Sequence, residues 1–284
     1  YSIDEGFIDL TSSLNYFIPD KTLGKKEKLD KVSAMIQREI WQKTGIYSTV
    51  GMSNANPLLA KLALDNEAKH NQNMRANWSY EDVETKVWAI PKMTDFWGIG
   101  SRMEKRLNKL GIFTIKERAS VKPEILKKEL GIVGVELFFH ANGIDESNVH
   151  QPYKPKSKSI GNSQVLPRDY RKKADIELVF REMAEQVAIR LRRAHKKATN
   201  VSIYVGFSKH EKKHRIQAQM KIEPSNNTKQ LTEHVLTLLR KKYDSGAVRH
   251  IAVSYSGLVD ESYSTFSLFD DIEKIEKEER LQSA

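Results

Sequence analysis

The 284-residue sequence contains no cysteine. A disulfide framework, thiolate zinc sites and cysteine nucleophiles are therefore excluded, and the composition agrees with a reducing compartment such as the cytoplasm. No apolar run approaches the roughly 20 residues that a helix needs to span a bilayer, and no signal peptide opens the chain. We therefore expect a cytoplasmic protein without membrane segments. The chain opens with Tyr1 rather than methionine, which favours a fragment whose upstream part is missing.

Acidic residues are the minority charge, with 37 Asp and Glu against 47 Lys and Arg, a net charge of +10. This balance favours a polyanionic partner. Much of the surplus lies in residues 151–200, which carry 13 Lys and Arg against 5 Asp and Glu. Hydrophobic residues make up 39% of the chain. At this length they favour two or three small cores over one large core.

The first eighty residues mix predicted strands and helices. Residues 1–10 alternate apolar and polar side chains, which indicates a strand. Apolar residues recur every three or four positions over residues 25–42 and predict an amphipathic helix that ends at Gly45. The other predicted elements are a strand over 47–52 and a helix opened by Pro57. We interpret residues 1–80 as an incomplete α/β unit.

Residues 81–152 are predicted to form a small all-helical unit, because helical segments follow one another with no strand pattern between them. Glycines punctuate the turns at Gly98-Ile99-Gly100, Gly111, Gly131-Ile132-Val133-Gly134 and Gly143. Residues 153–158 then have the composition of a linker, with Pro155 and no apolar periodicity. We place a domain boundary at this linker.

Residues 159–269 have the element order β-α-β-β-α-β. The strands are predicted over 159–165, 201–207, 216–222 and 251–255, and the helices over 175–194 and 228–243. Each strand has one apolar face for the helices, so the polar face of the sheet can meet solvent or a flat polar ligand. An acidic tail, residues 270–284, follows. The fold class is therefore a multidomain α+β protein.

Asp4 and Glu5 are the first candidates for chemistry. Neighbouring side chains of a strand point to opposite faces, but at a strand end both carboxylates can reach divalent ions, and Mg²⁺ prefers such hard oxygen ligands. Two such ions support in-line nucleotidyl transfer to a 3′-hydroxyl. The alternative is a solvated acidic turn.

The segment Phe96-Trp97-Gly98-Ile99-Gly100-Ser101 is a second candidate. Two glycines before a helix let backbone N–H groups approach a phosphate without obstruction, and Arg102 and Lys105 add charge. The pattern is typical of sequence-independent binding to a nucleic-acid backbone. An ordinary tight turn between packed helices is the alternative. Gly131 to Gly134 form a weaker candidate of the same kind.

The basic surface of the last domain is a third candidate. It includes Arg190 and Arg193 within residues 151–200, and a further basic turn follows at Lys209 to Arg215. Charge runs are usually solvated faces. Beside an open sheet face, this one favours binding to the backbone of DNA or RNA.

Residues 1–10 resemble the Ser-Ile-Asp-Glu palm motif of Y-family translesion DNA polymerases, especially the UmuC-like (ImpB/MucB/SamB) branch. Three further segments recur in the family's order and spacing, and together they extend the resemblance over essentially the whole chain. They are Val50 to Ala63, the helix-hairpin-helix at Phe96 to Gly100, and Lys158 to Ser163. The resemblance implies the C-terminal part of a palm over 1–80, a thumb over 81–152 and a little-finger domain over 159–269, whose sheet lies in the DNA groove.

The resemblance also implies roles for individual residues. Asp4 and Glu5 would be catalytic carboxylates that hold Mg²⁺, with two ions in the complete enzyme. Lys69, and with a less clear role Lys61, would bind the triphosphate of the incoming nucleotide. The residues that would bind primer–template DNA are Gly98, Gly100, Arg102, Lys105, Lys158, Ser159, Gly161, Asn162, Arg190 and Arg193.

The chain departs from the family pattern in three ways, and the first is a spacing that looks one residue longer at Asn54 to Pro57. The family's first metal-binding Asp and its fingers, which lie upstream of the Ser-Ile-Asp-Glu segment, are absent, so we expect the chain to lack full polymerase activity. Residues 265–269 resemble the family's sliding-clamp pentapeptide with Thr in place of Gln. The resemblance thus implies a sliding clamp, bound through Thr265, Phe266, Leu268 and Phe269, and a UmuD-like accessory protein as further partners. Packing of Phe266 and Phe269 on the last domain is the alternative.

The leading hypothesis is an error-prone translesion DNA polymerase that acts in the response to DNA damage. A non-catalytic DNA-binding module explains the charge and the turns equally well, but it needs no acids near DNA, where they would repel phosphate. A helix-hairpin-helix glycosylase requires a catalytic Lys or Asp just after the hairpin. The residues there belong to a helix that would grip phosphate, so we discount this second alternative.

Overall fold

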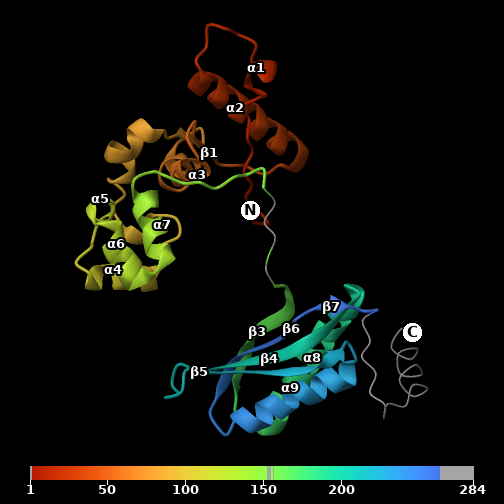
Figure 1. The fold of residues 1–284 in the computed structure, drawn as a ribbon. Coiled ribbons are helices and arrows are strands. Elements are labelled where there is room, and N and C mark those ends of the chain that lie inside the picture. Colours follow the sequence, from red (N-terminus) through yellow and green to blue (C-terminus); the bar gives the residue numbers. More distant parts are fainter. Residues whose placement is uncertain (1, 152–154, 156, 263–284) are drawn as a thin grey trace. The chain divides into compact units, whose positions relative to one another are not determined.

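The computed structural model describes residues 2–151, 155 and 157–262 (Figure 1). The chain divides into two compact units, Tyr1–Pro152 and Tyr153–Ala284. Each unit has its own cluster of buried hydrophobic side chains. Across the described ranges, no helix combines the length and the apolar character that crossing a bilayer requires.

The first unit begins with a mixed α/β segment. Its elements are α1 (Leu14–Phe17), α2 (Lys25–Thr44), β1 (Val50–Met52), α3 (Pro57–Asn66), the 3-10 turn η1 (Ala68–His70) and β2 (Arg75–Asn77). The predicted helix over residues 25–42 is confirmed as α2, and Gly45 ends it with a left-handed φ of 70°. The strands β1 and β2 pair in parallel. The sequence pattern missed β2, because three residues are too short to show a period.

The predicted strand over residues 1–10 is wrong. Residues 3 and 4 form a bend, and residues 5–10 have no regular secondary structure. A strand needs a neighbour to accept and donate its backbone hydrogen bonds, and β1 pairs only with β2 among the described strands. Side-chain contacts hold the segment instead, because Glu5 pairs with Lys61 and the Asp9 carboxylate lies 2.8 Å from His150 Nε2.

Gly51 allows β1 to lie directly against α3. A methyl group on Gly51 would come within 1.9 Å of the backbone carbonyl oxygen of Ala60 and 2.6 Å of the Leu64 Cβ. Only glycine fits this approach without a shift of the backbone. The side chains of Leu58, Leu59 and Leu62 on α3 are buried, so the same contact fixes the inner face of the helix.

We expect Gly51→Ala to lower the free energy of unfolding by about 3 kcal/mol, because a backbone carbonyl cannot move aside as a flexible side chain does. Gly6→Ala is the control, since a methyl group there meets nothing within 4 Å. Urea unfolding of the two variants measures the difference. Equal unfolding midpoints would show that α3 is free to shift away from β1.

The rest of the first unit is helical, as predicted for residues 81–152. It contains the short helical turns η2 (Tyr80–Asp82), η3 (Val83–Val87) and η4 (Met93–Asp95), followed by α4 (Ser101–Lys109), α5 (Ile115–Ser120), α6 (Pro123–Leu130) and α7 (Ile132–Ala141). One hydrophobic cluster joins Leu59 and Trp78 to Phe96, Ile115 and Leu137. The segments on both sides of residue 80 therefore share a core.

The second unit confirms the predicted order β-α-β-β-α-β. Its elements are β3 (Ser159–Tyr170), α8 (Lys173–Arg193), β4 (Lys196–Phe207), β5 (Arg215–Ser225), α9 (Thr228–Lys242), β6 (Val248–Ser256) and the short β7 (Val259–Asp260). The strand order is β3-β6-β4-β5, and β7 pairs with β4. All of the pairings are antiparallel.

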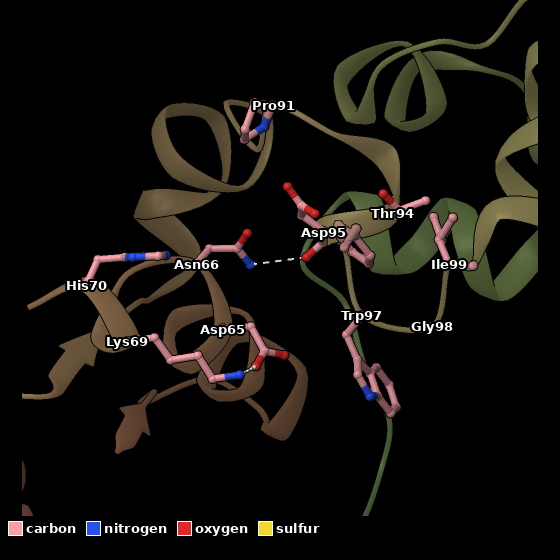
Figure 2. A pocket seen from close by; sticks show the side chains of 12 residues that line it. Asp65, Asn66, Lys69, His70, Pro91, Thr94, Asp95, Trp97, Gly98 and Ile99 are labelled. Carbon is pink, nitrogen blue, oxygen red and sulfur yellow. Dashed lines mark hydrogen bonds and ion pairs between the residues drawn. The ribbon is translucent and has the colours of Figure 1, made fainter. Parts of the chain in front are cut away.

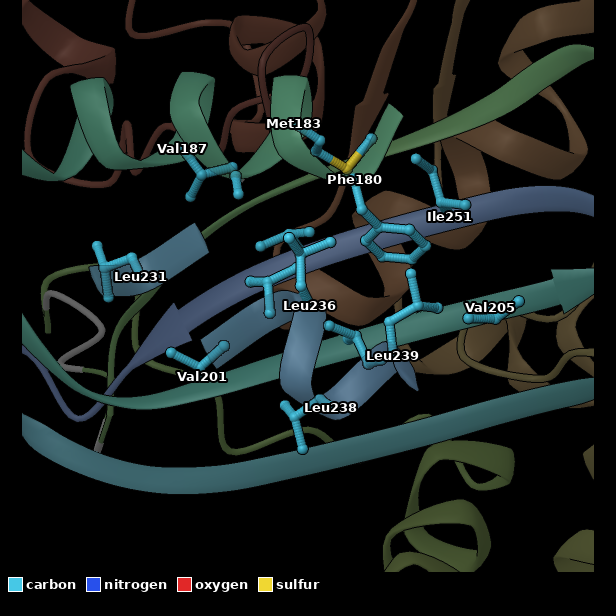
Figure 3. Close-up of a cluster of buried hydrophobic side chains, with 14 of the residues drawn as sticks. Phe180, Met183, Val187, Val201, Val205, Leu231, Leu236, Leu238, Leu239 and Ile251 are labelled. Carbon is cyan, nitrogen blue, oxygen red and sulfur yellow. The ribbon is translucent and has the colours of Figure 1, made fainter. Parts of the chain in front are cut away.

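Both helices of the second unit pack on one face of its sheet. Phe180, Met183 and Val187 of α8 and Leu236 and Leu239 of α9 are buried in one cluster (Figure 3). The same cluster contains Val201, Val205 and Ile251 of the strands (Figure 3). Because successive strand residues alternate between faces, the residues between these apolar positions form the opposite, open face.

The strand register identifies the residues of this open face. Ser202 of β4 lies opposite Gln219 of β5 and Ser254 of β6, and Ser254 in turn lies opposite Gly161 of β3. The neighbouring row joins Tyr204, Gln217, Ala252 and Ser163, and the row beyond Ser254 joins Asn200, Lys221, Ser256 and Ser159. The open face is thus lined by small or polar side chains, as the sequence predicted.

Candidate nucleic-acid and metal site

Four charged side chains of the first unit form one alternating chain. Lys61 Nζ lies 2.7 Å from Glu5 Oε1 and 3.2 Å from Asp65 Oδ2. Asp65 also contacts Lys69, with 2.7 Å between Lys69 Nζ and Asp65 Oδ1 (Figure 2). Lys61, Asp65 and Lys69 lie at successive i,i+4 positions on α3 and η1, which places them on one side of the chain. The two predicted triphosphate ligands, Lys61 and Lys69, are thereby linked to the predicted catalytic residue Glu5.

The centre of this chain is the least exposed part. The Lys61 side chain is 10% exposed, against 35% for Glu5. Burial pulls the pKa of Lys61 down, but the hydrogen bonds to Glu5 and Asp65 outweigh it and raise the pKa above its ordinary value. Lys61 is therefore a cation at neutral pH and fixes the position of the Glu5 carboxylate.

Asp4 lies in the bend beside Glu5 and is exposed. The Ser2 hydroxyl donates to Asp4 Oδ1 at 2.8 Å, which holds the pKa of Asp4 below its ordinary value, and the charge of Lys61 acts in the same direction. Both predicted catalytic carboxylates are thus accessible to solvent, and neither is turned into an apolar interior.

Asp4 and Glu5 provide an incomplete set of metal ligands. In the part of the chain that the structure describes, no three His, Cys, Asp or Glu side chains are grouped to hold a metal ion. Mg²⁺ in phosphoryl-transfer sites is bound by one or two carboxylates and completed by water and substrate phosphates. The two accessible carboxylates therefore offer the oxygen donors that Mg²⁺ prefers. They complete its ligand set only together with oxygens of the substrate and water.

A pocket of about 720 Å³ lies between the C-terminal end of α3 and the turn before α4 (Figure 2). Asp65 and Lys69 line one side of it, and Gly98 and Gly100 line the other. Asn66 bridges the two sides, because its side-chain amide donates to the backbone carbonyl of Asp95 (Figure 2). The structure thus brings the predicted ligand Lys69 to the same pocket as both predicted glycines.

The turn from Phe96 to Gly100 is anchored by apolar side chains and presents glycines outward. Phe96 and Ile99 are buried at 1% and 4% exposure, whereas Gly98 and Gly100 are exposed. Gly98 has a φ of 87°, which requires glycine, and Gly100 caps α4 without a side chain. Within the described residues, no acceptor takes the backbone N–H groups of Gly98, Gly100 or the first two residues of α4. The turn therefore offers free donors and a positive helix end to an anion.

The predicted basic residues Arg102 and Lys105 lie on α4, directly after this turn. Both are exposed, and neither forms an ion pair with any described residue. By contrast, the weaker candidate Gly131 to Gly134 has a packing explanation. A methyl group on Gly134 would lie 2.2 Å from the Leu126 carbonyl oxygen, so glycine is needed there for the close approach of α7 to α6.

The predicted DNA-binding residues of the second unit are divided between two layers. Ser159 and Gly161 lie on the open face of the sheet, and Lys158 is exposed just before β3. Asn162 faces the helices, since its amide donates to Gln186 of α8 at 3.4 Å.

Two predicted arginines also belong to the helical layer. Arg190 lies on α8, and its guanidinium group donates to the backbone carbonyl of Gly161 over 2.8 Å. Arg193 is exposed at the end of the same helix. The structure therefore does not bring the two arginines to the open face.

Two features of these sites were missed by the sequence analysis. Asp65 forms ion pairs with both Lys61 and Lys69. The i,i+4 spacing of the three residues is the sequence signal that predicts these ion pairs. Tyr204 and His250 form an edge-to-face pair with ring centroids 5.1 Å apart next to Gly206. The alternation of β4 and β6 would have placed them on the open face.

The predicted clamp residues Thr265, Phe266, Leu268 and Phe269 lie outside the described residues.

Three profiles of one family match this sequence. The impB/mucB/samB family matches residues 1–65, the IMS family HHH motif matches residues 80–112, and the impB/mucB/samB family C-terminal domain matches residues 157–268. The matches include Asp4 and Glu5, the turn at Gly98 and Gly100, and the sheet of the second unit.

Similar curated proteins include three from Bacillus subtilis (strain 168). The putative UV-damage repair protein UvrX is 37% identical over 98% of this chain, and the DNA repair protein homolog YobH is 42% identical over 62% of it. The match covers 81% of YobH. The DNA polymerase IV 2 of the same organism is 35% identical over 96% of this chain. The chain spans 64% of the length of UvrX and of this polymerase.

A solved structure has the same fold. The Y-family DNA polymerase chimera Dbh-Dpo4(243-245)-Dbh aligns with 89% of this chain and 68% of its own length, with a TM-score of 0.66 and 20% sequence identity. This likeness confirms the predicted fold class. The chain therefore belongs to the impB/mucB/samB family and has the fold of a Y-family DNA polymerase.

Proposed function

We propose that this chain belongs to an error-prone translesion DNA polymerase, which extends a primer on damaged template DNA in the cytoplasm. The observation that carries the proposal is the pocket shared by Lys69, Gly98 and Gly100, because it combines a cation with free backbone donors. The names of its relatives, a UV-damage repair protein and DNA polymerase IV, support the same activity. The domains would be the C-terminal part of a palm over 1–80, a thumb over 81–152 and a little finger over 159–269.

In this proposal, Asp4 and Glu5 hold Mg²⁺ together with the triphosphate of the incoming nucleotide. Such an ion, one of two in the complete enzyme, would activate the primer 3′-hydroxyl and neutralise phosphate charge. Lys61 keeps Glu5 in place, and Lys69 offers its ammonium group to a phosphate in exchange for Asp65. The solvent access of both carboxylates agrees with access for a large polyanionic substrate.

DNA would be held by its backbone in both units. In the first unit, a phosphate would accept from the free N–H groups at Gly98 and Gly100, with Arg102 and Lys105 beside it. In the second unit, the open sheet face would lie against the duplex, with Ser159 and Gly161 along the backbone. These contacts do not depend on base sequence, which suits an enzyme that must accept damaged templates.

The non-catalytic DNA-binding module remains the second candidate. It uses the same turn and the same sheet face, so DNA binding alone does not separate it from a polymerase. The arrangement of Asp4 and Glu5 favours the polymerase, because accessible carboxylates near a DNA-binding pocket weaken a tether by repelling phosphate. A sliding clamp and a UmuD-like protein are further partners that the family resemblance alone supports.

We expect Gly100→Ala to weaken binding of primer–template DNA about tenfold, or about 1.4 kcal/mol, because the added methyl group stands where the phosphate approaches. Alanine adopts the φ of −95° at this position, and nothing lies within 4 Å of its methyl group. Fluorescence anisotropy with a labelled duplex measures the affinity.

Gly24→Ala is the matched control. Gly24 also caps a helix without a side chain, so alanine costs a similar amount of helix stability at both positions. The control should bind DNA as the unmodified chain does. Unchanged affinity of Gly100→Ala would mean that the turn is only a connection between helices.

A further inference from the structure

Arg118 is a fully buried arginine without a counter-ion among the described residues. It lies on α5, where Ile115 and Ala119 are also buried, so the inner face of this helix carries a guanidinium group among apolar side chains. None of its three side-chain nitrogens has a hydrogen-bond partner in the described ranges. Burial alone lowers the pKa of Arg118 to about 9, and no carboxylate opposes the shift. Arg118 therefore remains a cation at neutral pH.

The aromatic contact of this guanidinium leads to the turn that lines the pocket. The Arg118 guanidinium carbon lies 4.1 Å from the centroid of the Phe96 ring. Phe96 is the buried anchor of the turn, and the exposed glycines Gly98 and Gly100 follow within four residues. The cation is thus held against the inner side of the segment whose outer side carries the free N–H groups.

The charge of Arg118 also acts on other groups nearby. Burial lowers the pKa of His140, and Arg118 lowers it further against the opposing charge of Asp145. A charge in an apolar interior is screened much less than one in water, so its field extends over several side chains. A contact with an aromatic face does not repay the loss of hydration of a whole guanidinium group. An unpaired cation at this depth is therefore a cost to the fold that a bound anion would offset.

We propose that Arg118 is a positioning residue for DNA, a buried cation that strengthens phosphate binding at the Phe96–Gly100 turn without touching the DNA. The proposal rests on the function proposed above, since it assumes that a backbone phosphate occupies this turn. The phosphate would supply the counter-charge that Arg118 lacks among the described residues. Phe96 transmits the effect by holding the guanidinium group against the turn.

Three variants of the chain test this role. Arg118→Met removes the charge and keeps a long apolar side chain, and Lys31→Met removes one exposed charge on α2 as a control. Arg118→Lys retains a cation when the assay is run at pH 6, because burial lowers the pKa of a lysine ammonium group as it does that of the guanidinium. We expect Arg118→Met to bind labelled primer–template DNA about five- to tenfold more weakly, or about 1 to 1.4 kcal/mol, and to unfold at the same or a higher temperature. Arg118→Lys should restore most of the affinity, and Lys31→Met should change it little.

The two readouts separate this role from a structural one. Unchanged affinity of Arg118→Met for DNA overturns the proposal. A loss of both affinity and thermal stability, or a failure of the variant to fold, also overturns it, because the charge would then support the fold itself. A loss of affinity that Arg118→Lys does not restore also overturns it. Gly100→Ala tests the phosphate site separately from the role of Arg118. Normal DNA binding by that variant would reject the phosphate site in the turn. Weak binding by Gly100→Ala with normal binding by Arg118→Met rejects only the role of Arg118.

Discussion

Replacement of Asp4 by asparagine and Glu5 by glutamine is expected to reduce primer extension by about a thousandfold or more, because the amides no longer bind Mg²⁺ as carboxylates do. The substitutions preserve the local contacts. The amide oxygen introduced at position 4 can still accept from the Ser2 hydroxyl, and the amide oxygen at position 5 can still accept from Lys61. Primer extension with Mg²⁺, assayed with the polypeptide that the complete gene encodes, measures the loss.

The affinity for DNA should stay the same or rise in this double variant, since two negative charges near a phosphate are removed. Asp20→Asn is the matched control, because Asp20 is also exposed and accepts hydrogen bonds from a residue two positions away, Thr22. It should leave primer extension unchanged. Normal extension by the double variant would remove the catalytic assignment of Asp4 and Glu5. Absence of primer extension by the unmodified polypeptide would leave the non-catalytic DNA-binding module as the better account.

The helices and the second unit could be predicted from sequence because their apolar residues keep one period over long stretches. The helix α2 spans 20 residues, and β4 has 12 residues with an alternating buried face. Residues 1–10 also alternate apolar and polar side chains but form no strand. An alternating pattern shows that a segment could bury one face, but it does not show that a neighbouring strand is present for backbone hydrogen bonding. Short elements such as β2 carry too few residues for any period.

The candidate site was predictable where chemistry depends on residues close in sequence. The spacing of Gly98 and Gly100 before a basic helix indicated a phosphate site, and the structure leaves the N–H groups of both glycines free of acceptors among the described residues. The approach of Lys69 to the same pocket depends on how α3 packs, which the sequence does not show. For the same reason, the buried position of Arg118 was missed, because arginine on a short helix is ordinarily exposed.

Conversion of Gln217 and Gln219 to glutamate is expected to weaken DNA binding about a hundredfold, since each substitution adds a negative charge to the open face of the sheet. Both side chains are exposed, and the register places them opposite Tyr204 and Ser202. Glutamate has nearly the same shape as glutamine, so the fold should be retained. Anisotropy with a labelled duplex over a series of salt concentrations measures the loss, which should shrink as salt screens the added charges.

The single variants Gln219→Glu and Gln186→Glu compare the two layers of the second unit directly. Both add one negative charge at an exposed glutamine, but Gln186 lies on α8, on the side of the sheet that the helices cover. If DNA lies on the open face, Gln219→Glu weakens binding about tenfold and Gln186→Glu changes it little. The reverse result would move the DNA to the helical layer. It would favour Arg190 and Arg193 of that layer as the residues that contact the DNA backbone.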